Sequence, residues 1–577
     1  MINSYSDKLP FKGFFTRSQE EKKETANVKI WYINDVHGQL SKMDGIKISS
    51  DKFKQDAKNY YQPVDTFLIS SGDNCIDTDV PKNRLWIECL NKIGLDYSAL
   101  GNHELDNGEK GFTDLLERAN FKFLSANTEV QKDSPVYKHK DKIVKSDISI
   151  QNGHKYGFIG VAPMDLKEAV GGNADLSGIS LGKSEQELRK KEKELSELIK
   201  HPSPLSNQNI TDKFQAVFER LKLGIFKDTV QSISDELDKL KKQGINKIFL
   251  VSHLGKQADI GLINEIKQGH LKGIDVILGG HSHDVFKNAS PENLLSLMPN
   301  MYEKSEQNMF LDSENNIVVV TQAGKNGEYA GLLDVEFDKH GSIRSVGNKL
   351  DKIKERVKDP LIQELKDKFL GKNKDIGKLK VFNNIINENQ KLENPLASFV
   401  ADAIKHKAGA DIAFFNNSKV RGKIGSEENA EPVQVITKRE IEELLPFKNK
   451  IYKVELTADE IKQAIDHGAS TLSTKPEYLQ TSGLKYKLDS NNKVSQIFIE
   501  QPDGTDKNLS EYKPTHKFSV AYDGYLFAGS IGYKMLNQED RVMNIFDWTM
   551  SDAVTEYIKN QSEPIEISPQ ERIKIEN

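Results

Sequence analysis

Five short apolar runs, each ended abruptly by polar residues, constrain the fold of this 577-residue chain more than any other feature. Each run is rich in β-branched or large apolar side chains and gives way at Gly, Asp, Asn or His to a polar or helical segment. The runs are 28–33, 66–69, 97–100, 247–251 and 275–278. Strands that alternate with helices in this way predict an α/β architecture built from layers.

Between the third and fourth runs the sequence predicts helices. Ser184 and Glu187 have the spacing of a capping box, and apolar residues at 188, 195, 198 and 199 fall on one helical face. Pro202 and Pro204 would end that helix, and a second apolar stripe over 230–240 leads into the fourth run. We interpret 184–243 as a helical insertion.

The length of the chain predicts at least two domains, because a single hydrophobic core stops growing well below this size. Around 347–380 the composition becomes strongly charged, and Asp359-Pro360 is typical of a helix start that Gly371 would end. We expect an N-terminal tail at 1–27, a first domain at 28–345, a linker helix region at 346–379, a smaller α/β domain at 380–560 and a C-terminal tail at 561–577.

Charge and cysteine content exclude several classes of protein. The 81 basic and 86 acidic residues are mixed along the chain, so no basic stripe favours a nucleic-acid polymer. Only two cysteines are present, Cys75 and Cys89, too few for a disulfide framework or a thiolate metal site.

The first 27 residues lack the apolar core of a signal peptide, and no stretch is long enough to span a membrane. By itself this pattern favours a cytoplasmic protein, and it indicates no partner protein.

The residues that follow the five runs are of types that hold divalent metal ions. Two pairs, 35 with 37 and 281 with 283, are two residues apart, so each pair would point to one side if strand geometry persists. The two oxygens of Asp73 could bridge a pair of cations. All candidates follow strands at the end where open α/β sheets bind ligands. The candidate ligands are Asp35, His37, Asp73, Asn102, His253, His281 and His283.

Each motif alone has a simpler interpretation. An Asp-x-His or Gly-Asp pair is usually a turn, a cap or a hydrogen-bonded core histidine. The chain contains only 13 histidines, however, and candidates end all five runs. The combination therefore favours a metal centre.

The segments 34–38 (Asn-Asp-Val-His-Gly), 101–104 (Gly-Asn-His-Glu) and 279–283 (Gly-Gly-His-Ser-His) resemble those of the calcineurin-like metallophosphoesterases, specifically the 5′-nucleotidase and UDP-sugar hydrolase family. The resemblance covers about 28–339 and 380–558. It implies a four-layer β-sandwich flanked by helices and followed by a smaller α/β domain. It also implies one metal held by Asp35, His37, Asp73 and His283, and another held by Asp73, Asn102, His253 and His281.

Two divalent ions about 3.5–4 Å apart can clamp a phosphoryl group and supply a bridging hydroxide. Mixed His, Asp and Asn ligation suits Zn, Mn, Fe or Co. The resemblance implies that His103, Asp106 and Asn102 are catalytic, with Asp106 holding the imidazole of His103 in one tautomer. The expected reaction is hydrolysis of a small-molecule phosphomonoester, with a nucleotide favoured. A phosphodiesterase or pyrophosphatase acting on a UDP-sugar or cyclic nucleotide remains open, as does a ligand-binding protein with a vestigial metal centre.

In this family the second domain binds the nucleoside between two aromatic rings, and members are often periplasmic or extracellular. Here 446–449 (Pro-Phe-Lys-Asn) resembles the element that supplies one ring, 481–484 (Thr-Ser-Gly-Leu) resembles the loop that follows, and 416–421 resembles an Asn-x-Gly-Gly-Ile-Arg segment. The substrate-binding candidates implied are Asn416, Arg421, Phe447, Asn449, Gly483 and Tyr525.

Four positions depart from the family pattern. Ser418 and Lys419 replace the two glycines of the 416–421 segment, Gln390 stands where an arginine is usual, and Ile531 stands where an aspartate is usual. Losing an arginine and a carboxylate removes charge-assisted hydrogen bonds. We therefore expect weaker nucleotide binding than is typical of the family.

Overall fold

The computed structural model describes residues 25–60, 63–76, 79–170, 174–188, 190–191, 207–286, 308–354, 357–381, 392–420, 424, 433–471 and 478–576. The chain divides into two compact units, Met1–Gly371 and Lys372–Asn577. Each unit is described by itself.

Two mixed sheets form the centre of the first unit. The first has the order β15 (Ile343–Lys352), β14 (Tyr329–Phe337), β1 (Ala26–Ile33), β2 (Asp65–Ser70), β3 (Tyr97–Ala99), β4 (Lys122–Leu124) and β6 (Ile143–Val144). The second has the order β12 (Met309–Leu311), β13 (Ile317–Thr321), β11 (Val276–Leu278), β10 (Ile248–Ser252), β8 (His154–Val161) and β7 (Ser146–Gln151). All five predicted runs are strands, three of them in the first sheet and two in the second.

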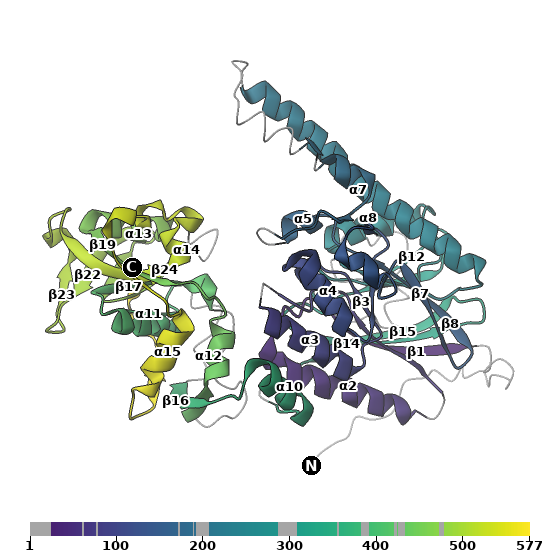
Figure 1. The fold of residues 1–577 in the computed structure, drawn as a ribbon, viewed down its shortest axis with the longest axis horizontal. Coiled ribbons are helices and arrows are strands. Elements are labelled where there is room, and N and C mark those ends of the chain that lie inside the picture. The colour runs from purple at the N-terminus through teal and green to yellow at the C-terminus, as the bar shows by residue number, and fades with distance from the viewer. Residues whose placement is uncertain are drawn as a thin grey trace, which may run out of the picture. The chain divides into compact units, whose positions relative to one another are not determined.

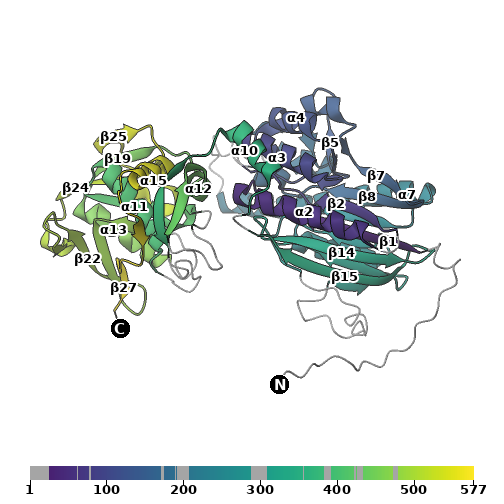
Figure 2. The same ribbon diagram turned by 90° about the horizontal axis from the view of Figure 1, so that it is seen from below.

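The sheets pack face to face, and helices cover their outer faces (Figures 1 and 2). One buried cluster, which includes Ile30, Phe67 and Phe249, fills the space between the sheets. A second cluster joins the first sheet to α2 (Met43–Lys58), α3 (Val80–Ile93) and α4 (Gly108–Arg118). A third joins the other sheet to α7 (Asn207–Lys242) and α8 (Lys256–Lys267). The expected four-layer α/β sandwich is confirmed.

The strand β10 shows why its run is apolar without alternation. Phe249 and Val251 face the core between the sheets, whereas Ile248 and Leu250 face the helices α7 and α8. A strand buried on both faces needs apolar side chains at every position.

The predicted capping box at Ser184 is not formed. The helical segment already begins at residue 183, and the Ser184 backbone N–H donates to Asp228 Oδ2 at 3.0 Å. A carboxylate from α7 therefore accepts a hydrogen bond from an N–H group in the first turn of this helix. The rest of that predicted helix, 192–204, lies outside the described residues.

The helix predicted around Asp359 is α10 (Pro360–Leu370). The Asp359 side chain accepts hydrogen bonds from the N–H groups of Leu361 and Ile362, and Gly371 ends the helix. Lys366 Nζ donates to the Leu40 carbonyl at 2.6 Å and pairs with Asp44 at 2.8 Å. This helix is thus packed into the first unit, beside α3 in Figure 2.

The second unit is built on a five-stranded sheet of order β20 (Leu479–Ser482), β17 (Ile412–Asn416), β24 (Lys517–Asp523), β19 (Ile451–Thr457) and β25 (Val542–Phe546). One face packs on α11 (Pro395–Ala408) and α15 (Met550–Lys559), and the other on α13 (Ala458–Ser470). The sequence pattern also predicts helices near 396–404 and 457–465, the second opened by a capping box of Thr457 with Glu460. These helices are α11 and α13, and the capping box is formed.

The segment 561–577, expected to be a tail, contains β26 (Ile565–Ile567) and β27 (Ile573–Ile575). The strand β26 pairs with β16 (Asp375–Val381), whose other neighbour is β18 (Val433–Thr437). The strand β27 pairs with β21 (Leu484–Leu488), beside β22 (Val494–Glu500) and β23 (Asp506–Asn508). Three-residue strands carry too little pattern to be recognised locally, and their pairing partners are distant in the sequence.

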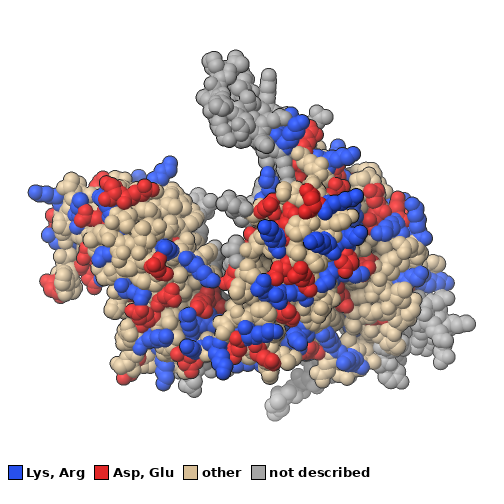
Figure 3. Space-filling model, viewed as in Figure 1, with Lys and Arg blue, Asp and Glu red and all other residues tan. Residues whose placement is uncertain are grey.

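The face in Figure 3 carries basic and acidic side chains interspersed on both units. This agrees with the mixed charge of the sequence. Among the described helices, none combines the length and apolar character that crossing a bilayer would require.

Candidate functional site

The loops after β1, β2, β10 and β11 are joined by hydrogen bonds between the two sheets. The N–H groups of Asp35 and His37 donate to the carbonyls of Gly72 and Asp73 at 3.0 and 2.9 Å. The His281 N–H donates to the Asp35 carboxylate at 2.9 Å, and His253 Nδ1 donates to the Ser71 carbonyl. The carboxyl ends of strands from both sheets therefore form one cluster.

Five of the seven candidate ligands have left-handed backbones. Their φ angles are 50° at Asp35, 51° at His37, 53° at Asp73, 71° at His281 and 63° at His283. Such angles are uncommon outside glycine and concentrate at functional sites. The pairs two residues apart therefore do not reach the centre by strand alternation, as the spacing suggested. They lie beyond the strand ends, in turns that direct both side chains inward.

Six of the seven candidate ligands, together with His103, fall into three groups of described side chains that could hold a metal ion. One group contains Asp35, His37 and His283, a second contains Asp73, His253 and His281, and a third contains His37, Asp73 and His103. Asp73 Oδ2 lies 3.5 Å from His37 Nε2 and 3.1 Å from His253 Nε2. A single carboxylate thus faces a histidine of each group.

Asn102 fits the same centre. Its Oδ1 is buried and has no hydrogen-bond partner in the part of the chain that the structure describes. A buried amide oxygen without a donor is unfavourable unless another group satisfies it. Together with imidazole nitrogens and carboxylate oxygens, it completes a donor set that suits a divalent cation.

The electrostatics of the cluster also favour cations. Burial raises the pKa of Asp73, but the adjacent His253 and His37 lower it well below its usual range. Burial lowers the pKa of His253, but Asp73 and Asp35 raise it to about 10. Metal binding at this cluster would therefore release protons from the imidazoles.

His103 and Asp106 form the expected pair. His103 Nδ1 lies 2.7 Å from Asp106 Oδ2, and the His103 N–H donates to Asp73 Oδ1 at 2.9 Å. The His103 side chain is 26% exposed, unlike the fully buried His253, so it can reach a molecule bound at the centre.

Three buried polar residues outside the prediction hold these loops. Glu104 accepts hydrogen bonds from the N–H groups of Asp73, Asn74 and Gly101. Asn34 Nδ2 donates to Asp35 and to the Gly324 carbonyl. The third residue, Gln322, supports the loop after β11. Its Nε2 donates to the Gly280 carbonyl, and its Oε1 accepts from Ser282 Oγ and the Asp284 N–H.

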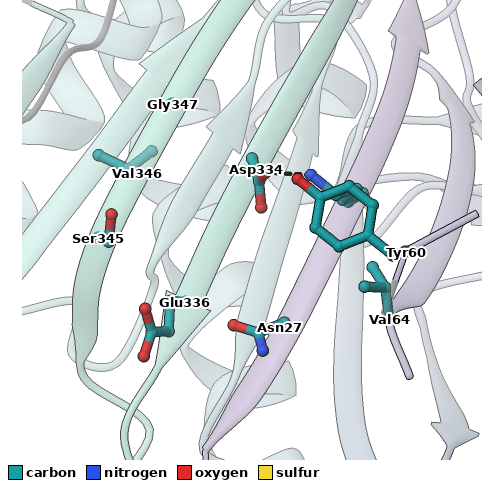
Figure 4. Close-up of a pocket in the computed structure, with 9 residues that line it drawn as sticks. Asn27, Tyr60, Val64, Asp334, Glu336, Ser345, Val346 and Gly347 are labelled. Atoms are coloured by element: carbon teal, nitrogen blue, oxygen red, sulfur yellow. Dashed lines mark hydrogen bonds and ion pairs between the residues drawn. The ribbon is translucent and has the colours of Figure 1, made fainter. Parts of the chain in front are cut away.

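A surface depression of about 410 Å³ lies elsewhere on the first unit, on β1, β14 and β15 (Figure 4). Its lining includes Asn27, Tyr60, Asp334 and Glu336. It adjoins the start of β1, whereas Asp35 follows the end of that strand. It is therefore separate from the candidate metal centre.

In the second unit, four of the substrate-binding candidates lie together at one end of the strands of the five-stranded sheet. Strands β17 and β24 are parallel and end there at Asn416 and Asp523, and Ile451, the start of antiparallel β19, pairs with Asp523. Phe447 and Asn449 precede β19, and Tyr525 follows β24.

The structure does not bring Gly483 to this end of the sheet. Strand β20 runs antiparallel to β17, with Leu479 opposite Asn416, so Gly483 follows the far end of β20. A Cβ atom at Gly483 would lie 2.2 Å from the Asp411 carbonyl oxygen, at the start of β17. This glycine permits close backbone packing there. Arg421 and Gln390 lie outside the described residues.

Ile531, which stands where the family pattern has an aspartate, has a left-handed backbone with φ 49°. Its carbonyl accepts a hydrogen bond from His467 Nε2 at 2.9 Å. A β-branched residue is unfavourable in this conformation, which aspartate and asparagine tolerate better. The loop thus keeps a backbone suited to the residue that this chain lacks.

Comparison with known proteins agrees with the fold and the motifs. Residues 375–538 match the family described as "5'-nucleotidase, C-terminal domain". The chain is 26% identical to the 5′-nucleotidase of Vibrio vulnificus over 592 residues, which covers 94% of this chain and 92% of that protein. It is 24% identical to the trifunctional nucleotide phosphoesterase YfkN of Bacillus subtilis, which covers 85% of this chain but only 31% of that longer protein.

Among solved structures, the 5′-nucleotidase precursor from Thermus thermophilus matches with a TM-score of 0.56 and 20% identity, covering 96% of this chain and 99% of that one. This similarity supports the fold. Residues 375–538 thus match the 5′-nucleotidase C-terminal domain family, and over most of its length the chain is similar to 5′-nucleotidases, which are hydrolases that act on phosphoester bonds.

Proposed function

We propose that the chain is a metal-dependent phosphomonoesterase of the 5′-nucleotidase type, acting on a small-molecule phosphoester. The observation that supports this most is the position of Asp73, which faces His37 on one side and His253 on the other at 3.5 and 3.1 Å. A carboxylate shared by two groups of ligand-type side chains is the arrangement that a two-metal centre requires.

Asp35, His37, Asp73 and His283 would hold one divalent ion, and Asp73, Asn102, His253 and His281 the other. When bound, the two ions would supply the nucleophile and the positive charge that phosphoryl transfer needs. The hydrogen bond from His253 Nδ1 to the Ser71 carbonyl directs its Nε2 toward Asp73, so that this nitrogen is available as a ligand.

His103 would act on the phosphoryl group or the leaving group. Its Nδ1 is held by Asp106, so Nε2 is the atom that can donate a hydrogen bond to a phosphoryl oxygen or a departing oxygen. In the second unit, Asn416, Phe447, Asn449 and Tyr525 are the proposed ligand-binding side chains, and they lie together at one end of its five-stranded sheet.

The test is hydrolysis of a panel of phosphomonoesters, nucleotides and phosphodiesters by the purified chain, with Zn, Mn, Fe or Co added after chelation. Activity should disappear on chelation and return with metal. Asp73→Asn should abolish turnover, because the substituted side chain loses the charge that both groups share. Wild-type hydrolysis by Asp73→Asn after chelation and metal restoration would rule out the two-metal mechanism.

A further inference from the structure

Lys419 places a buried ammonium group where the second unit gathers its two aromatic candidates. Its Nζ pairs with the Asp523 carboxylate and donates to Asn449 Oδ1 at 3.2 Å. The same nitrogen lies over two rings, 4.4 Å from the centroid of Tyr525 and 5.1 Å from that of Phe447. The Lys419 and Asp523 side chains are only 7% and 4% exposed.

This ammonium occupies the ring faces that a nucleobase would need. An aromatic base binds between two rings by stacking on their faces, and a cation attracted to the same π-systems excludes it from that space. Moving Lys419 away would also leave the Asp523 carboxylate buried without its cation, which is strongly unfavourable. Binding of a base therefore has to compete with the existing contacts of Lys419.

The two segments that carry the rings are tied together. The Asp523 side chain caps α14 (Gly524–Phe527), the helix that carries Tyr525. The Gly524 N–H donates to the Lys450 carbonyl at 2.8 Å, which joins this helix to the loop of Phe447 and Asn449. Asp523 thus positions both the lysine and one ring, so the contacts belong to one connected arrangement.

We propose that Lys419 is a specificity-determining residue that competes with an aromatic base for the faces of Phe447 and Tyr525. The chain consequently favours phosphoesters with a non-aromatic leaving group over nucleoside monophosphates. The effect on base binding stands on the second unit alone, whereas the substrate preference rests on the proposed hydrolase activity.

The first test measures adenosine binding to the full chain by titration calorimetry, which needs no turnover. The wild type should bind adenosine weakly, with a Kd on the order of 1 mM or above. Lys419→Ala should bind it at least about tenfold more tightly, since both ring faces become available. The double variant Lys419→Ala/Asp523→Asn should show the same gain in affinity. It leaves no buried charge, and asparagine can still cap α14. The matched control is Lys448→Ala, an exposed lysine in the Phe447 loop, which should bind as the wild type does.

The second test compares kcat/KM for AMP with that for glycerol phosphate, whose leaving group has no ring. Lys419→Ala should raise the ratio of AMP to glycerol phosphate about tenfold. Micromolar binding of adenosine by the wild type, or unchanged or weaker binding by both Lys419 variants, would overturn the inference. If neither phosphoester is hydrolysed but Lys419→Ala gains adenosine affinity, the proposed hydrolase activity fails while the role of Lys419 in base binding stands.

Discussion

Individual side chains of the proposed metal centre are positioned by backbone conformations that few residues adopt. Asp35, His37, Asp73, His281 and His283 all have positive φ angles. Each such residue costs about 1–3 kcal/mol unless its surroundings compensate. Hydrogen bonds donated by Asn34 and Gln322 and accepted by Glu104 hold these turns in place. These hydrogen bonds therefore offset part of the cost of the left-handed conformations.

His103 has a different place in this arrangement, because Asp106 holds its ring while the side chain stays partly exposed. We expect His103→Ala to lower kcat by about 10²–10⁴-fold, the range typical of residues that transfer a proton in the transition state. Metal content measured by elemental analysis should stay unchanged. Asp106→Asn should have a smaller effect in the same direction. If His103→Ala lost a metal equivalent, His103 would instead be a ligand.

The sequence predicts residues of this kind when they lie in compact motifs. Asp35 with His37 and His281 with His283 are recognisable because two ligand types stand close together after an apolar run. Gln322 gives no such signal, since its role depends on a loop some forty residues earlier in the chain. Its only local sign is its position directly after β13, another strand end at the same site.

At the scale of elements, the turns after β2 and β11 approach His253 so closely that a side chain would not fit. A Cβ atom at Gly280 would lie 2.8 Å from both His253 Nδ1 and the Ser71 carbonyl oxygen, the two atoms of the hydrogen bond that orients this histidine. We expect Gly280→Ala to displace His253 and to lower metal affinity about 10- to 100-fold, as the loss of supporting contacts around a metal typically does. Metal titration of the purified variant measures this.

The matched control is Gly347→Ala on β15. A Cβ atom at Gly347 meets no atom within 4 Å, and its φ is not positive. An alanine there should be neutral or slightly stabilising, because glycine weakens a strand. Equal metal affinity in the two variants would show that close packing at Gly280 does not support the centre.

The elements themselves could be predicted to different degrees. The five apolar runs and the capped helices α10, α11 and α13 follow local sequence patterns, and the structure contains all of them. The strands β26 and β27 have three residues each and depend on partners far away in the chain. The capping of Ser184 also depends on a distant residue, Asp228. A local sequence pattern therefore does not predict an element whose pairing or capping partner is distant in the sequence.

At the scale of the whole molecule, carboxyl groups that folding buries make stability depend on pH. Asp96 lies before β3, and its Oδ2 accepts a hydrogen bond from the Leu68 N–H at 2.8 Å. Burial raises the pKa of Asp96 to about 6, while the Leu68 hydrogen bond and the nearby Lys54 lower it. Because the folded state binds this proton more tightly than the unfolded state, stability falls as the pH rises from the ordinary value of an aspartate through about 6.

Asp96→Asn removes this loss while keeping an oxygen that can accept the Leu68 hydrogen bond. We expect the variant to be more stable than the wild type by about 1–3 kcal/mol at pH 8, and to gain little at pH 4, where the wild-type carboxyl is protonated in the folded state. Urea unfolding followed by tryptophan fluorescence measures the difference, since Trp31 and Trp86 are both buried in the first unit. Asp238→Asn on the exposed side of α7 is the control, and it should leave the urea concentration at the midpoint of unfolding unchanged at both pH 8 and pH 4. An equal gain for Asp96→Asn at both pH values would mean that the substitution acts through packing and not through the charge of the buried carboxylate.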